Sequence, residues 1–217
     1  MLTREVPFST VVRSDYGTLV QSASNIGNGA TVVITLGAAP TVGDVLILEL
    51  MGGGTAWVQP TLAQTGVTWT KLVQSTNGVV ADCEIWKGVV AAGASATLTL
   101  TKPSGTYYYG GTLSQWRGIT GTLISSVSGV AASGSSYVGC NPSSIVPNVN
   151  CLALLIGIIA GGTGASMQAA GPYVMTSNNN FYWIGYANGP LVGAPLPSLI
   201  VGGNSAFAST ALLALIT

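Results

Sequence analysis

The sequence predicts an all-β protein, a jelly-roll-like antiparallel β-sandwich of about eight strands. The 217 residues include 30 glycines among many Ser, Thr and Val, a composition typical of strands joined by tight turns. Turn residues recur at a spacing of roughly 8–15 residues, the pattern of sandwiches and barrels, and no stretch of a dozen residues has helical periodicity. The hydrophobic content of 48% excludes ordinary disorder. These observations together favour a packed β-protein.

Individual strands are predicted where apolar or β-branched runs lie between turn residues. Residues 1–28 are expected to form an N-terminal arm, and residues 29–217 a single sandwich. Met1 is followed by charged residues and no apolar segment, so we expect no signal peptide. The expected strands are Ala30–Leu36, Val45–Met51, Val67–Gln74, Asp82–Val90, Ala96–Lys102, Thr106–Arg117 and Cys151–Ala160. The last of these is too short to cross a bilayer as a helix, which needs about 20 residues, and is interpreted as a strand buried on both faces.

The second half of the chain repeats the first in the order of its segments. Ala39–Leu48 matches Val146–Leu155, with Pro and Val in register and an apolar strand after each. We expect two four-strand quasi-repeats, at about 29–120 and 137–217, that together form one eight-strand sandwich. The alternative is two separate small β-domains.

Charge is scarce and unevenly placed. The chain has six Lys or Arg, six Asp or Glu and no His, and residues 118–217 contain no charged residue at all. About a quarter of an ordinary domain is charged. Zero net charge without a basic cluster argues against nucleic acid and against an anionic membrane surface as partners. Because charge normally keeps a protein soluble, we expect this one to belong to an assembly.

The few acidic residues offer little chemistry. Asp82 and Glu84 would share one face of a strand, and paired carboxylates serve in glycoside hydrolysis or hold Ca²⁺. We instead interpret Glu84 as an outward residue that Lys71 or Lys87 neutralises across strands. Asp44 is interpreted as an acceptor of local backbone hydrogen bonds. With no His for a triad and no phosphate-binding loop, we expect no enzyme, no metal and no cofactor.

Three cysteines, Cys83, Cys140 and Cys151, make an odd number without a Cys-x-x-Cys spacing. They are interpreted as small buried residues. A bond between Cys140 and Cys151 across neighbouring strands is the alternative.

Aromatic residues are the remaining candidates for a binding site. In a strand, Tyr107 and Tyr109 would face one way and Tyr108 the other, so at least one of them should meet solvent or a partner. Exposed Tyr is typical of protein interfaces, and stacking on sugars is the alternative use. Trp57 is the second candidate for such stacking, while packing in the core is the favoured interpretation of the tryptophans.

Five segments in order carry a family resemblance. They are APTVGDVLIL at 39–48, GVTWTKL at 66–72, IWKGVVAAG at 85–93, ATLTLT at 96–101 and QWRGI at 115–119. This series resembles a recurring β-domain in virion proteins of tailed bacteriophages and prophages, over residues 38–217. The resemblance implies a jelly-roll-like sandwich on the particle surface, as a capsid decoration or tail-associated protein. It implies no catalytic residues.

The leading hypothesis is therefore a capsid decoration (cement) protein, made in the host cytoplasm and located on the virion exterior. It would act through contacts with copies of itself, for example in a trimer, and with a major capsid protein. One alternative is a tail-tip or fibre module that binds a glycan through Tyr107–Tyr109 or Trp57. A second alternative is a bacterial surface or filament subunit.

Overall fold

The structure, a computed structural model, contains only strands as regular elements in the part of the chain that it describes. The described residues are 16–54, 57–78, 81–102, 107–131, 137–140, 150–159, 163–169, 174–179, 182–189, 199–204 and 209–217. They include no helix with the length and apolar character needed to span a membrane.

Sixteen strands are described, eight in each half of the chain. The first eight are β1 (Thr18–Gly27), β2 (Thr31–Thr35), β3 (Val45–Gly54), β4 (Thr61–Ala63), β5 (Val67–Asn77), β6 (Ala81–Val90), β7 (Thr97–Thr101) and β8 (Tyr107–Arg117). The second eight are β9 (Leu123–Ala131), β10 (Tyr137–Cys140), β11 (Cys151–Ile159), β12 (Thr163–Ala169), β13 (Val174–Asn179), β14 (Tyr182–Gly189), β15 (Leu199–Asn204) and β16 (Ser209–Ile216).

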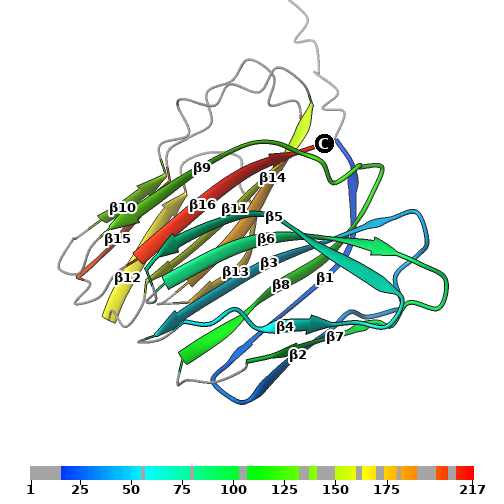
Figure 1. The fold of residues 1–217 in the computed structure, drawn as a ribbon. Coiled ribbons are helices and arrows are strands. Elements are labelled where there is room, and N and C mark those ends of the chain that lie inside the picture. Colours follow the sequence, from blue (N-terminus) through cyan, green and yellow to red (C-terminus); the bar gives the residue numbers. More distant parts are fainter. Residues whose placement is uncertain are drawn as a thin grey trace, which may run out of the picture.

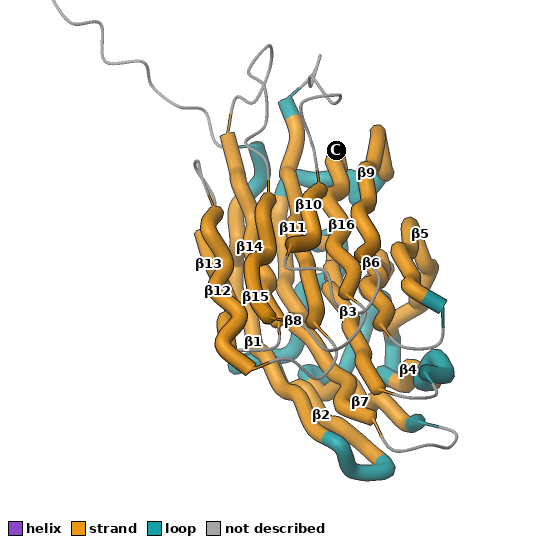
Figure 2. Tube along the Cα trace, turned by 90° about the vertical axis from the view of Figure 1, so that its left-hand side faces the viewer, coloured by secondary structure: helices purple, strands orange, loops and turns teal. Residues whose placement is uncertain are grey.

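These strands form four antiparallel sheets that stack as layers (Figure 1). Sheet A has the order β1-β8-β3-β6-β5, and sheet B, on one of its faces, has the order β2-β7-β4. Sheet C has the order β13-β14-β11-β16-β9, and sheet D has the order β10-β15-β12. The layers follow one another as B, A, C and D. Figure 2 shows the same strands from the side.

The two halves share one strand order. Each strand of sheets A and B has a counterpart eight strands later, in the same place in sheets C and D. Val45 on β3 pairs with β6 and β8 in the same register in which Leu152 on β11 pairs with β14 and β16. The match of Ala39–Leu48 with Val146–Leu155 predicts this equivalence.

Even the bulges are repeated. Val20 in β1 and Ile124 in β9 are the extra residues of equivalent bulges, and so are Leu72 in β5 and Thr176 in β13. These four strands are the edge strands of sheets A and C, whereas a further irregularity in β12 of sheet D has no counterpart in β4. A bulge twists an edge strand away from pairing with another chain.

The predicted antiparallel β-sandwich is confirmed, but the strand number was wrong. Each repeat contains eight strands rather than four. Residues 18–27, expected in the N-terminal arm, form β1 and pair with β8, whereas residues 1–15 lie outside the described residues. Each repeat divides its strands five to three between its sheets, and the finer jelly-roll description stays a prediction.

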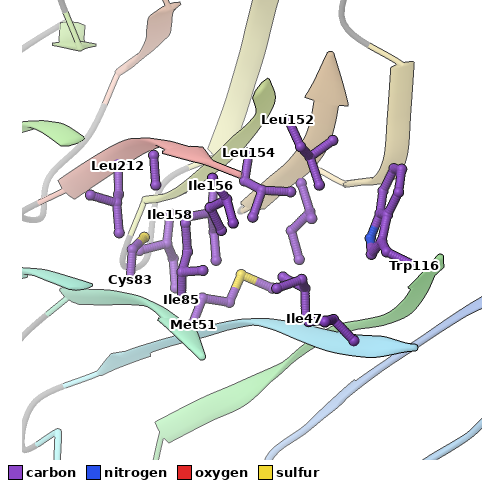
Figure 3. Close-up of a cluster of buried hydrophobic side chains, with 14 of the residues drawn as sticks. Ile47, Met51, Cys83, Ile85, Trp116, Leu152, Leu154, Ile156, Ile158 and Leu212 are labelled. Carbon is purple, nitrogen blue, oxygen red and sulfur yellow. The ribbon is translucent and has the colours of Figure 1, made fainter. Parts of the chain in front are cut away.

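Two hydrophobic cores separate the first three layers. Between sheets A and B lie Val32, Ile34, Leu36, Leu46, Leu48, Leu50, Trp57, Val90, Ala94, Leu98, Leu100, Tyr109 and Leu113. Between sheets A and C lie Val45, Ile47, Met51, Ala81, Cys83, Ile85, Trp116, Ile119, Leu152, Leu154, Ile156, Ile158, Ile184, Leu212, Ala214 and Ile216 (Figure 3).

The central strands β3 and β11 are apolar, apart from Glu49 on β3, because both of their faces are covered. Successive residues of β3 enter the A–C core and the A–B core in turn. The prediction that CLALLIGIIA is a strand buried on both faces is also confirmed, since residues 151–158 on β11 are all buried. Strand β3 packs on β11, and β5 packs on β9, the counterpart of β1. The two repeats are therefore related by an approximate two-fold axis, as in an isologous dimer interface.

Candidate functional site

The tyrosine run on β8 is divided between the surface and the core. Tyr108 is 62% exposed, whereas Tyr109 is fully buried between sheets A and B. The Tyr109 hydroxyl donates to the carbonyl oxygens of Ala30 at 3.0 Å and Leu100 at 3.2 Å. The Tyr107 side chain lies outside the described part of the structure. Of the two described side chains, only Tyr108 is available to a partner.

Trp57 belongs to the core and not to a binding surface. It is buried between sheets A and B, and its indole ring lies directly on Gly52 of β3. A Cβ atom at Gly52 would overlap that ring. This packing fixes Trp57 and leaves no open ring face of the kind that stacks on a sugar.

The most polar buried region of the described chain surrounds Asp82 and Glu84 on β6. Both carboxylates are fully buried, on the face of β6 that carries Trp86. Lys71 on β5 donates to Glu84 Oε1 at 2.7 Å, and Trp86 Nε1 donates to Glu84 Oε2 at 2.6 Å. The predicted neutralisation by Lys71 is confirmed. The predicted outward position of Glu84 was wrong, because sheet B and residues 57–60, which precede β4 of that sheet, cover this face of sheet A as well.

Glutamine side chains complete this network. Lys71 Nζ also donates to Gln59 Oε1 at 2.6 Å and to Gln74 Oε1 at 3.0 Å. Gln74 Nε2 in turn donates to Asp82 Oδ2 at 2.5 Å. Sequence reasoning missed both glutamines, since neither stands at a recognisable motif spacing.

Burial changes the acidity of Asp82. Its Oδ1 atom is buried and has no hydrogen-bond partner. Burial, opposed by the Gln74 hydrogen bond and assisted by the charge of Glu84, raises the pKa of Asp82 to about 7. Two carboxyl groups placed close together are the arrangement that acid–base chemistry uses. Neither is accessible to a substrate, however, and the described residues contain no group of three His, Cys, Asp or Glu able to hold a metal.

Asp44 forms a second ion pair at the start of β3. Arg117 donates from Nε to Asp44 Oδ1 at 3.0 Å and from its second terminal nitrogen to Oδ2 at 3.1 Å, while Gln115 Nε2 donates to Oδ2 at 2.6 Å. The Arg117 hydrogen bond is the main cause that lowers the pKa of Asp44. The predicted backbone acceptor role was wrong, because β8 pairs beside β3 and places these longer donors against the carboxylate.

Glu49 is the acidic residue that sequence reasoning overlooked. It lies on β3 between Ile47 and Met51, is 2% exposed, and leaves Oε1 without a hydrogen-bond partner. Burial raises the pKa of Glu49 well above its ordinary value. The signal was available in the sequence, since Glu49 is the single charge within the apolar run VLILELM.

The cysteines described with their side chains are not cross-linked. Cys83 and Cys151 are buried free thiols, which excludes a Cys140–Cys151 bond. Burial raises the pKa of Cys151 to about 11, so this thiol is unreactive in the folded protein.

An uncharged outer face on sheet B is the described surface best suited to a protein contact. Thr31, Thr101 and Thr61 form one row across its three strands, and Val33, Thr99 and Ala63 form the next. These side chains are exposed or half-buried. The face offers hydroxyl and methyl groups and no charge.

The acidic side chains that the structure describes are thus buried within the fold, and no metal-binding group of three stands among the described residues. Comparison of the chain with family models, with curated proteins and with solved structures found no match in any of the three.

Proposed function

We propose that this protein is a non-enzymatic structural protein of a phage particle, most simply a capsid decoration protein on the virion exterior. It would act through contacts with copies of itself and with a major capsid protein. The resemblance of its five ordered segments to virion β-domains gives the proposal its direction.

The observation that carries the proposal is the burial of the acidic side chains. Asp44, Glu49, Asp82 and Glu84, all the acids with a described position, are buried. The folded surface therefore carries less charge than even the sequence indicates. Such a surface lacks the usual protection against association and suits a protein whose surface is covered in an assembly.

The bulged edge strands support assembly through faces rather than through strand addition. All four edges of sheets A and C carry a bulge, and a bulged edge resists pairing with another chain. We propose the outer face of sheet B, which includes Thr31, Thr61, Thr99 and Thr101, as one contact surface.

A glycan-binding module of a tail tip or fibre is the second candidate. Tyr108 is the observation in its favour, because this large aromatic side chain is 62% exposed. The burial of Trp57 and Tyr109 weakens this candidate, since they provide no second platform beside Tyr108. A bacterial surface or filament subunit remains the third candidate, and no described feature favours it.

The copy number of the chain in a purified phage particle tests the proposal. Hundreds of copies would indicate a capsid protein, a handful would indicate the tail, and none in any particle would refute a virion role. Glycan-array binding that is lost in Tyr108→Ala would instead favour the second candidate.

A surface variant tests the proposed contact. Thr99→Lys introduces a charge in the centre of the sheet B face and should reduce incorporation into particles. Val42→Lys introduces the same charge at an exposed position outside that sheet and should have no effect. Equal incorporation of both variants would rule out this face as a contact.

A further inference from the structure

Glu49 occupies an unusual place, on the central strand of sheet A and on the face turned toward sheet C. Its neighbours on that face of the strand, Ile47 and Met51, belong to the A–C core (Figure 3). The carboxyl group is buried, and its Oε1 atom has no hydrogen-bond partner. A buried carboxylate without a partner is costly when it is charged and far less so when it is protonated.

No described group on the facing surfaces supplies a compensating charge. The titratable residues on that side are Cys83 and Lys87 on β6, Tyr108 on β8, Tyr16 before β1, and Tyr182 and Tyr186 on β14. Lys87 Nζ is held by the carbonyl oxygen of Thr120 at 2.6 Å. The remaining charges on β5 and β6 lie on the other face of sheet A, in the Glu84 network.

Sheet C has no charge to offer in any side-chain conformation. Residues 118–217 contain no charged residue, so every strand of sheets C and D is uncharged. The position equivalent to Glu49 on β11 is Ile156, as the shared pairing register shows. The A–C interface therefore combines one acidic residue with a second half that cannot neutralise it.

We propose that Glu49 is a proton-dependent latch between the two halves of the chain. Sheets A and C stay closed while its carboxyl group is protonated, and they separate more readily as the pH rises. Sheet B stays packed on sheet A, and sheet D on sheet C. The latch concerns the closure of one chain and is independent of what the chain assembles with.

The direction of the effect follows from proton linkage. Burial raises the pKa of Glu49 in the closed protein, whereas an opened interface would return it to about the ordinary 4.5. At pH values above about 4.5 the open form releases a proton that the closed form retains. The equilibrium constant for opening then rises by up to about tenfold per pH unit, until the closed form ionises too.

Two buried thiols can report on opening separately. Cys83 lies in the A–C core, where its Sγ atom donates to the carbonyl oxygen of Thr210 at 3.7 Å. Cys151 on β11 is buried on the opposite face of its strand from Leu152, away from sheet A. Separation of sheets A and C exposes Cys83 alone, whereas global unfolding exposes both thiols.

The experiment is iodoacetamide labelling of the full chain over a range of pH, with the label at each cysteine measured by peptide mass spectrometry. Each rate is divided by that of a free-cysteine peptide labelled at the same pH, which cancels the intrinsic pH dependence of thiol reactivity. Labelling of Cys83 in excess of Cys151 then reports opening without global unfolding. Wild type is compared with Glu49→Gln, which keeps the shape and cannot ionise. Asp82→Asn is the matched control, because it removes a buried carboxyl group on the other face of sheet A.

The latch predicts that Cys83 is labelled faster than Cys151, and that its normalised rate rises with pH in wild type and in Asp82→Asn by up to about tenfold per pH unit. It predicts a normalised Cys83 rate in Glu49→Gln that does not change with pH. An equal rise in Glu49→Gln would overturn the proposal. Should that variant fail to fold, wild type decides the question, since equal labelling of Cys83 and Cys151 would mean that the halves do not separate.

Discussion

Replacement of Asp82 by Asn should change how the stability of the protein depends on pH. In the folded protein burial raises the pKa of Asp82 to about 7, against an ordinary value of 3.8. Between these two values the folded state holds a proton that the unfolded state releases, so stability falls as the pH rises. The difference of about 3 pKa units, at about 1.4 kcal/mol each, corresponds to about 4 kcal/mol at most.

Urea unfolding of wild type and Asp82→Asn, at several pH values between about 4 and 9, measures this contribution. The variant cannot ionise at this position, so its free energy of unfolding should gain on that of wild type by up to about 4 kcal/mol between about pH 4 and pH 7. Above about pH 7 the difference should be constant. Glu49 is present in both proteins, and its contribution cancels from the comparison.

Asp44→Asn provides a control of opposite sign. Arg117 lowers the pKa of Asp44, so the Asp44 contribution is present above its ordinary pKa of 3.8 and is lost as the pH falls through the lowered value. This variant should therefore follow wild type above about pH 5 with a constant offset. Parallel stability profiles for wild type and Asp82→Asn between about pH 4 and pH 7 would refute the conclusion that Asp82 is buried with a raised pKa.

Three further variants test the packing by urea unfolding. Lys71→Met leaves Glu84 buried without its cation and should lower the free energy of unfolding by about 3–5 kcal/mol. Adding Glu84→Gln to this variant should recover much of the lost stability. No recovery would show that the loss is not electrostatic. Gly52→Ala should cost about 1–3 kcal/mol, because the added Cβ atom overlaps the Trp57 ring. Gly37→Ala should be nearly neutral, because a Cβ atom there meets only Gln21, at 3.7 Å. Equal effects of the two variants would contradict the position of Trp57. Trp116→Ala should cost about 3–5 kcal/mol, because Trp116 is buried and meets the Tyr186 ring edge-on, with the ring centroids 5.0 Å apart. A loss below about 1 kcal/mol would contradict tight packing of sheets A and C.

The central strands could be predicted from the sequence because their environment leaves no choice. A strand covered on both faces is expected to be apolar along its length; β11 has this composition, and β3 departs from it only at Glu49. Strand β1 could not be predicted in this way. Its sequence, TLVQSASNIG, is polar because it is a largely exposed edge strand, and only pairing with β8 identifies it as part of the sheet.

The acidic residues show a second limit of sequence reasoning. The alternation of Cys83, Glu84 and Ile85 predicts correctly that two of these residues face one core. It does not predict what covers the other face, because that depends on sheet B, a layer formed by residues distant along the chain. The repeat was visible in the Pro and Val register, whereas its size was not, because a three-residue strand such as β4 leaves no periodic signal.

The shared register of the two halves creates a risk during folding. Neighbouring repeats with the same strand order and the same bulges can exchange strands, a known route to misassembly in repeat proteins. If β16 took the place of β8, Leu215 and Thr217 would stand where Gln115 and Arg117 bind Asp44. If β13 took the place of β5, Glu84 would meet Met175 in place of Lys71.

Each exchange would leave a carboxylate without its partner, and at the fully buried Glu84 this would cost about 3–5 kcal/mol. The ion pairs thus mark which strands belong to the first half. A chain with charges spread evenly over both halves would lose that distinction. Among the residues of the two repeats, every charge lies in the first, and this difference lets the polypeptide distinguish its two similar halves while it folds.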